Sequence, residues 1–154
     1  MGQAGDNEGK QGAPESAVRE NSDKIYFAHN ATLRIFGNIP DLDEITQALG
    51  ITPSSTHRKG DRFTGRILKP YAHDMWSYDA PAKETEPLHV HIDNLWNTFK
   101  GRKEYLIELK SNLAVDVFLG YRSNCDNAGV EVPYQSLEIF RELQIPFGLS
   151  IIVV

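Results

Sequence analysis

The stretch that decides the fold is DKIYFAHNATLRIFG, residues 23–37. Apolar side chains recur there at every second position, among them Ile25, Leu33 and Ile35. Successive side chains of a strand point to opposite faces, so this spacing predicts a long strand with one buried face. His29 falls on the inward face, where we expect a hydrogen-bonded core histidine.

Patterns typical of helices and further strands follow this first strand. Leu42, Ile45 and Leu49 lie at helical spacing and Gly50 can end that helix. The other expected elements are a short strand at 75–79, a helix from residue 88, a helical segment at 102–110, a strand at 113–121, a turn leading to a hairpin strand at 130–132, a helix at 133–144 and a terminal strand at 145–154. The last residues of that terminal strand are apolar on both faces, which favours a central position in the sheet.

These patterns predict an α+β fold, a mostly antiparallel sheet packed against helices. Two segments, IPDLDEITQALGITP (39–53) and VPYQSLEIFRELQIP (132–146), share a proline, a helical pattern and a second proline 13 residues later. They suggest two ferredoxin-like strand–helix–strand units. Either a duplication or the independent use of prolines at both ends of a helix would explain this similarity.

Length and composition indicate one domain. The chain has 154 residues and a net charge of −5, and residues 1–22 are polar and glycine-rich, so we expect a disordered tail at 1–22 and a single domain at 23–154. No apolar run is long enough to span a membrane. A single cysteine precludes an internal disulfide, which favours the cytoplasm.

Several of these pieces match a known family. The most specific are Arg58-Lys59-Gly60-Asp61, the pair Trp76-Ser77 and the histidine at 91, within a pattern that extends over residues 24–154. The chain resembles the bacterial family called domain of unknown function 4279. This resemblance implies a small bacterial α+β domain and no particular reaction. The segment RFTGRILKPYAHD, residues 62–74, and the polar tail depart from the family pattern.

The segment PLHVHIDNLW, residues 87–96, raises the question of a metal site. Histidines two apart share a face on a strand but diverge by about 200° on a helix. The stripe of Leu88, Ile92 and Leu95 favours the helix. We therefore expect His89 and Asp93 to pair on the surface and His91 to contact the loop around Arg58 and Asp61; no metal or cofactor is expected.

The largest local charge asymmetry lies in residues 57–70, which carry a net charge of +4. We expect Arg58 and Asp61 to be tied into the fold, and the remaining cations to be freer to meet an anion or an acidic partner. The candidate binding residues are Arg58, Lys59, Arg62, Arg66, Lys69 and Trp76. For Trp76, core packing is the favoured interpretation and partner contact the alternative.

No catalytic constellation emerges, so we expect a non-catalytic protein-binding domain, one form being an immunity-type partner of a toxin. The partner would be an acidic-surfaced protein; membrane binding is not expected and nucleic acid is disfavoured by the net charge. The alternative is a small-ligand or metal-binding enzyme that uses the loop at 57–73 together with His89 and His91. The sequence leaves the oligomeric state open.

Overall fold

The computed structural model describes residues 24–62, 69–126 and 129–154, so the tail expected at 1–22 lies outside the described residues. The described elements are, in chain order, β1 (Phe27–Gly37), α1 (Leu42–Leu49), β2 (Ser55–His57), β3 (Asp74–Asp79), α2 (Leu88–Phe99), the 3₁₀ turn η2 (Lys100–Arg102), α3 (Lys103–Leu109), β4 (Ala114–Ser123), the 3₁₀ turn η3 (Tyr134–Leu137), α4 (Glu138–Leu143) and β5 (Phe147–Val153).

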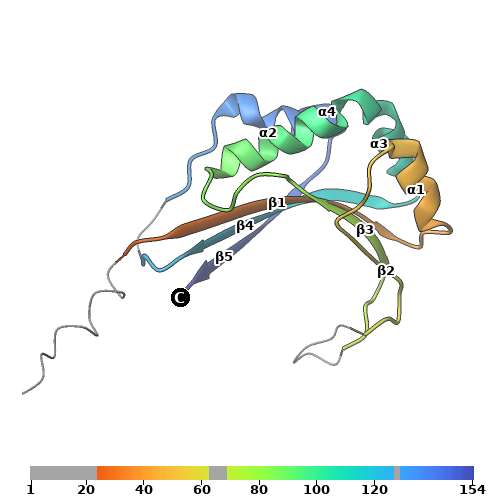
Figure 1. The fold of residues 1–154 in the computed structure, drawn as a ribbon. Helices are drawn as coiled ribbons and strands as arrows, with labels where there is room; N and C mark the ends of the chain where they lie inside the picture. Colours follow the sequence, from red (N-terminus) through yellow and green to blue (C-terminus); the bar gives the residue numbers. More distant parts are fainter. Residues whose placement is uncertain (1–23, 63–68, 127–128) are drawn as a thin grey trace, which may run out of the picture.

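The strands form one mixed five-stranded sheet within the described residues, in the order β2-β3-β1-β4-β5. Neighbouring strands are antiparallel except β4 and β5, which run parallel. The described helices all lie on one face of this sheet (Figure 1). The fold is therefore α+β, with a mostly antiparallel sheet, as the sequence predicts.

The core fills the space between the sheet and the helix layer. Alternate residues of β1 and β4 point into it, as the period of two requires. Its buried side chains include Leu33 and Ile35 from β1, Val117 and Leu119 from β4, and Ile92, Leu95 and Phe99 from α2. The first predicted strand and the predicted apolar stripe of α2 are thus confirmed as the two sides of one core.

Local signals fix the ends of α1. The Asp41 side chain accepts a hydrogen bond from the Asp43 N–H at the start, and Gly50 at the end has a φ of 66°. Glycine adopts this left-handed conformation without the steric cost that a Cβ brings. The helix predicted from Leu42 to Leu49 has these bounds in the structure.

Three expectations about the C-terminal half are not confirmed. Residues 130–132 form no strand, because β1 and β5 already occupy both edges of β4; instead Val132 packs against the core. The terminal strand β5 is an edge strand and is not central. The two equivalent ferredoxin-like units are not confirmed: the first joins β1 and β2 across β3, whereas the second joins direct neighbours, β4 and β5.

No helix among the described residues is long and apolar enough to cross a membrane.

Candidate functional site

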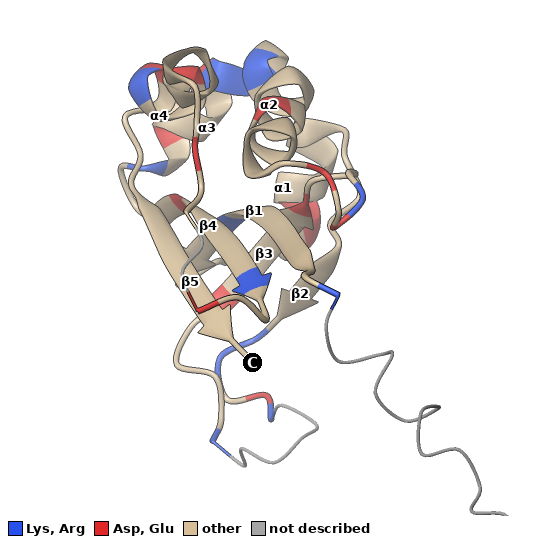
Figure 2. Ribbon diagram, turned by 90° about the vertical axis from the view of Figure 1, so that its left-hand side faces the viewer, with Lys and Arg blue, Asp and Glu red and all other residues tan. Residues whose placement is uncertain are grey.

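The two described ends of the predicted basic loop pair with each other as a hairpin that extends β2 and β3. We call residues 58–62 and 69–73 the basic arm; residues 63–68, with Arg66, lie outside the described residues. Gly60 N–H donates to the Tyr71 carbonyl and Tyr71 N–H to the Asp61 carbonyl, each at 2.9 Å. The Tyr71 ring stacks on His57 with centroids 3.5 Å apart. The arm projects away from the helix layer (Figure 1, Figure 2).

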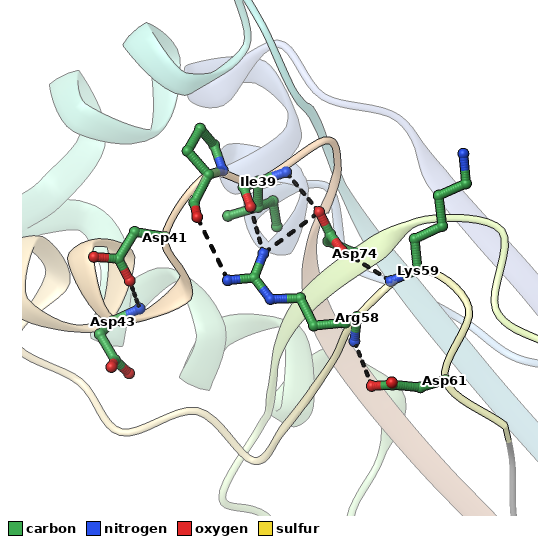
Figure 3. Close-up of polar contacts among 8 residues, drawn as sticks. Ile39, Asp41, Asp43, Arg58, Lys59, Asp61 and Asp74 are labelled. Atoms are coloured by element: carbon green, nitrogen blue, oxygen red, sulfur yellow. Dashed lines mark hydrogen bonds and ion pairs between the residues drawn. The ribbon is translucent and has the colours of Figure 1, made fainter.

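A buried carboxylate, Asp74, fixes the base of the basic arm (Figure 3). Its two oxygens accept the backbone N–H of Lys59 at 2.8 Å and that of Ile39 at 2.9 Å. The Arg58 guanidinium lies 3.6 Å from the same carboxylate and donates to the carbonyl of Ile39. Asp61 accepts the Arg58 backbone N–H at 2.8 Å. Arg58 and Asp61 are thus tied into the fold, as the sequence analysis favours.

Electrostatics keep this carboxylate charged. The backbone N–H groups of Lys59 and Ile39 lower the pKa of Asp74, with a further contribution from the Arg58 cation, and they outweigh the opposing effect of burial. Hydrogen bonds to the charged form act in this direction. The charged Asp74 therefore connects three separate segments: the turn after β1, the start of the arm and β3.

The remaining described cations of the arm lie outside this network. Lys59, Arg62 and Lys69 are exposed, and in the described part of the chain none of them forms a side-chain ion pair. The Lys59 side chain points away from Asp74 although its backbone is bound there (Figure 3). These three side chains are therefore available to an anionic partner.

Trp76 is not part of an accessible binding surface. Its side chain is fully buried, and its indole N–H donates to the Thr46 hydroxyl at 3.0 Å. The ring of Phe99 meets it edge to face, with centroids 6.4 Å apart. Its place in the set of binding residues is corrected: Trp76 packs β3 against α1 and α2.

The open face of the sheet carries a second group that the sequence analysis did not select. Arg34 of β1 forms a two-pronged ion pair with Asp116 of β4, at 2.8 and 2.6 Å. Its guanidinium lies over the Phe118 ring, 4.7 Å from the centroid, and 5.5 Å from that of Phe36. The sequence could have indicated this group, because these aromatic residues take outward positions on strands whose other face is buried.

The histidines fall into two groups at opposite ends of β1. His57 and His73 belong to the side of the arm, where His73 lies against Phe36. His29 lies seven residues before Phe36, about 23 Å along the strand. Its Nδ1 is 3.0 Å from the Glu86 carbonyl, so it is hydrogen-bonded as expected, although only half-buried.

His91 points into the protein near His29 and not toward the arm. It is 1% exposed, and neither ring nitrogen has a hydrogen-bond partner among the described residues. Burial lowers its pKa, against the smaller opposing effects of the Glu86 and Lys83 backbone groups. The expected contact between His91 and the loop around Arg58 is therefore wrong.

Nor does the neighbouring His89 form the expected surface pair with Asp93. His89 is half-buried and lines an open cleft of about 460 Å³ together with His29, Phe27 and Glu131. Across residues 24–62, 69–126 and 129–154, no group of three or more His, Cys, Asp or Glu side chains could hold a metal ion. The described parts of the loop, residues 57–62 and 69–73, do not share a site with His89 and His91.

Comparison with known proteins identifies one family. The family described as Domain of unknown function (DUF4279) matches residues 26–154, which is most of the chain, and the protein belongs to it. No curated protein and no solved structure matches the chain. Arg58 and Lys59, part of the segment 58–61 on which the resemblance in the sequence rests, contact Asp74, and Asp61 accepts from Arg58, so these residues hold the arm in place.

Proposed function

We propose that this protein is a non-catalytic binding domain that recognises an acidic-surfaced protein through the basic arm. The observation that supports this most directly is the division of labour within the arm. Arg58 and Asp61 fix its base around Asp74, while Lys59, Arg62 and Lys69 are exposed and unpaired within the described structure.

A fixed base favours recognition. Ordering a loop upon binding costs conformational entropy, so a segment held in advance retains more of the free energy of its contacts. Two backbone hydrogen bonds and the stacked rings of His57 and Tyr71 hold the hairpin in place, in addition to the Asp74 network. The cations are therefore presented from a defined position.

The open sheet face supplies neighbouring contact chemistry of the kind found in protein interfaces. Arginine and aromatic side chains carry a disproportionate share of binding energy at interface centres. Arg34 is held by Asp116 between two aromatic rings, and Phe36 lies beside His73 of the arm. The arm would attract an acidic partner, and this face would give it an apolar and polar surface on which to dock.

The chemistry of the partner follows from the charge distribution. Residues 57–70 carry +4 while the chain as a whole carries −5, so the arm is the largest local excess of positive charge in the sequence. A long polyanion such as nucleic acid would meet repulsion beyond it, whereas a protein with a local acidic patch would not. We infer an intracellular bacterial setting, in which an immunity-type role is one form of such binding.

The enzyme alternative is less well supported by this geometry, because the arm and the His89/His91 region lie at opposite ends of β1. The cleft lined by His29 and His89 is the observation that favours a small-ligand role. Thermal unfolding with panels of divalent metals and small anions tests it: a saturable stabilisation lost in His89→Ala would favour the cleft.

Charge reversal within the arm tests the binding proposal. The variant Lys59→Glu/Arg62→Glu/Lys69→Glu is compared with Lys24→Glu/Lys83→Glu/Lys100→Glu, which changes the net charge equally at exposed sites outside the arm. Wild type and control should capture the same stoichiometric acidic protein from nuclease-treated extract of the native cell, and the arm variant should lose it.

Salt dependence provides a second readout, since an interaction steered by exposed cations weakens as ionic strength rises. Capture of the same proteins by the arm variant would contradict the proposal. Retention from untreated extract that is absent from nuclease-treated extract would instead indicate a nucleic-acid ligand.

A further inference from the structure

The edge strand β5 carries an apolar surface that nothing in the described structure covers. Five of its side chains are about half exposed despite being large and apolar: Phe147 52%, Leu149 46%, Ile151 62%, Ile152 48% and Val153 50%. Val154 follows at 59%. Isolated apolar residues on a surface are ordinary, but a continuous strip of this kind usually marks an interaction site.

The backbone of β5 offers a free hydrogen-bonding edge. Val117 N–H donates to the Pro146 carbonyl and Val154 N–H donates to Ser123, so even-numbered residues of this segment face β4. In a parallel ladder the hydrogen-bonding direction alternates along the strand. The N–H and C=O groups of residues 147, 149, 151 and 153 therefore point outward, where another strand could pair with them.

The two edges of the sheet are protected very differently. At the opposite edge, β2 has only three residues, Ser55–His57, all with polar side chains, and it leads into the charged arm. Short length and charge are the usual devices that prevent edge-to-edge pairing. The segment 147–154 has neither charge nor proline, and its seven-residue strand is regular. This contrast points to an edge that is covered in the working protein.

We propose that a second copy of this chain covers the edge, with the two β5 strands paired antiparallel about a two-fold axis at Ser150. The strand is self-complementary in this register: Phe147 lies opposite Val153, and Leu149 opposite Ile151. Both pairs lie on the helix-side face, since Leu149 is in register with buried Leu119 of β4. Cross-strand apolar pairs of this kind stabilise sheets.

The unpaired N–H and C=O groups of β5 can be satisfied by another strand. Because β5 is complementary to itself in this register, the same strand of a second copy fits. The arrangement closes after two copies, so it predicts a dimer and no fibre. Each β5 would then become an interior strand of a ten-stranded sheet. That position agrees with its sequence, which is apolar on both faces as central strands are.

The apolar area that strand pairing would bury can be compared with that of known interfaces. Phe147 has roughly 150 Å² of side-chain surface and each of the five aliphatic side chains about 100 Å²; at about half exposure they could bury at most about 325 Å² per copy before any main-chain contribution. Val130 and Leu137, 42% and 41% exposed, border an apolar groove with Phe147 and Leu149 and extend the surface. The side-chain total is under half of the roughly 800 Å² per partner of an ordinary specific interface, and the paired main chain and this groove would add to it.

Sedimentation analysis of the full chain over about a hundredfold concentration range tests the proposal. Wild type should be a dimer that dissociates on dilution, and Leu149→Lys/Ile151→Lys should raise the dissociation constant at least about 100-fold. Thr56→Lys, on the opposite edge, should behave as wild type. Far-UV circular dichroism confirms that each variant folds. A monomeric wild type at every concentration would overturn the proposal, and so would a dimer that persists in the double variant.

Cross-linking tests the register separately. In a Cys125→Ser background, Ser150→Cys should form an intermolecular disulfide on mild oxidation, because the two copies of residue 150 lie opposite each other at the axis. Ser55→Cys on β2 is the matched control and should remain monomeric on a non-reducing gel. Equal cross-linking of both variants, or none at residue 150, would overturn this register. The test is independent of the basic arm, since charge reversal there should leave the dimer unchanged.

Discussion

Replacing Trp76 by phenylalanine provides the sharpest test of its reassignment from a binding surface to the core. The indole is fully buried and its N–H donates to Thr46 at 3.0 Å. Phenylalanine retains the edge-to-face contact with Phe99 but removes three side-chain heavy atoms and the hydrogen bond. We expect a loss of folding stability with no direct effect on partner binding.

The magnitude follows from these two losses. Two buried carbons contribute about 1.6 kcal/mol at roughly 0.8 kcal/mol each. The hydrogen bond contributes about 1 kcal/mol. Trp76→Phe should therefore cost about 2.5 kcal/mol, below the roughly 3–5 kcal/mol expected when a large aromatic side chain is cut to alanine.

Urea unfolding, monitored by far-UV circular dichroism and not by tryptophan fluorescence, measures this cost. The slope m of the unfolding free energy against urea concentration should be unchanged if the substitution affects stability alone. Thr46→Val removes the acceptor, and the double variant should reveal a coupling energy of about 1 kcal/mol between the two positions. A cost under about 0.5 kcal/mol, typical of exposed positions, would refute the buried position of Trp76. Additive effects would refute the hydrogen bond with Thr46.

The further predictions concern titratable groups and one crowded glycine. Burial lowers the pKa of His91 below its usual 6.5, so the unfolded chain binds this proton first and stability should fall as pH drops below about 6.5. His91→Leu should flatten the stability profile between about pH 7 and 5; an unchanged slope in chemical unfolding would count against this. The pKa of Glu142 is lowered by its ion pair with Lys103. The lowered pKa values of Asp74 and Glu142 act in a separate pH window, because their stabilisation is lost only as the pH falls below about 4. Gly120→Ala would bring a Cβ within 1.7 Å of the Asn30 amide oxygen, and we expect a cost of about 1 kcal/mol or less, because the exposed Asn30 side chain must move away. The same substitution in an Asn30→Ala background should be close to neutral by thermal or urea unfolding, and an equal cost in both backgrounds would contradict the contact.

Elements with local signals could be predicted from the sequence. Helix α1 has its N-terminal hydrogen-bond acceptor, its apolar spacing and its terminal glycine within ten residues. The position of β5 could not be predicted, because an apolar strand can lie either at the centre of a sheet or at an edge that pairs with another strand. The prediction of a hairpin strand at 130–132 was wrong for a related reason. Whether an edge of β4 is free depends on β5, which comes later in the chain.

The candidate site divides in the same way. The charge of the arm is visible in the sequence, but its anchor Asp74 is defined only once β2 and β3 pair and bring residue 59 back to it. The Arg34–Asp116 pair joins residues 82 positions apart through the register of β1 and β4. Such contacts depend on strand order, which periodicity does not specify.

The two proposals together define a geometry for the partner. In a β5-paired dimer, the two β2 edges would lie at opposite ends of a ten-stranded sheet, nine strand spacings or about 43 Å apart before twist. Each arm would stand at one of these ends. A partner with a single acidic patch would occupy each arm separately, whereas one with repeated patches could engage both and gain avidity. Leu149→Lys/Ile151→Lys should therefore leave the first kind of binding intact and weaken the second, which separates the contribution of the dimer from that of the arm.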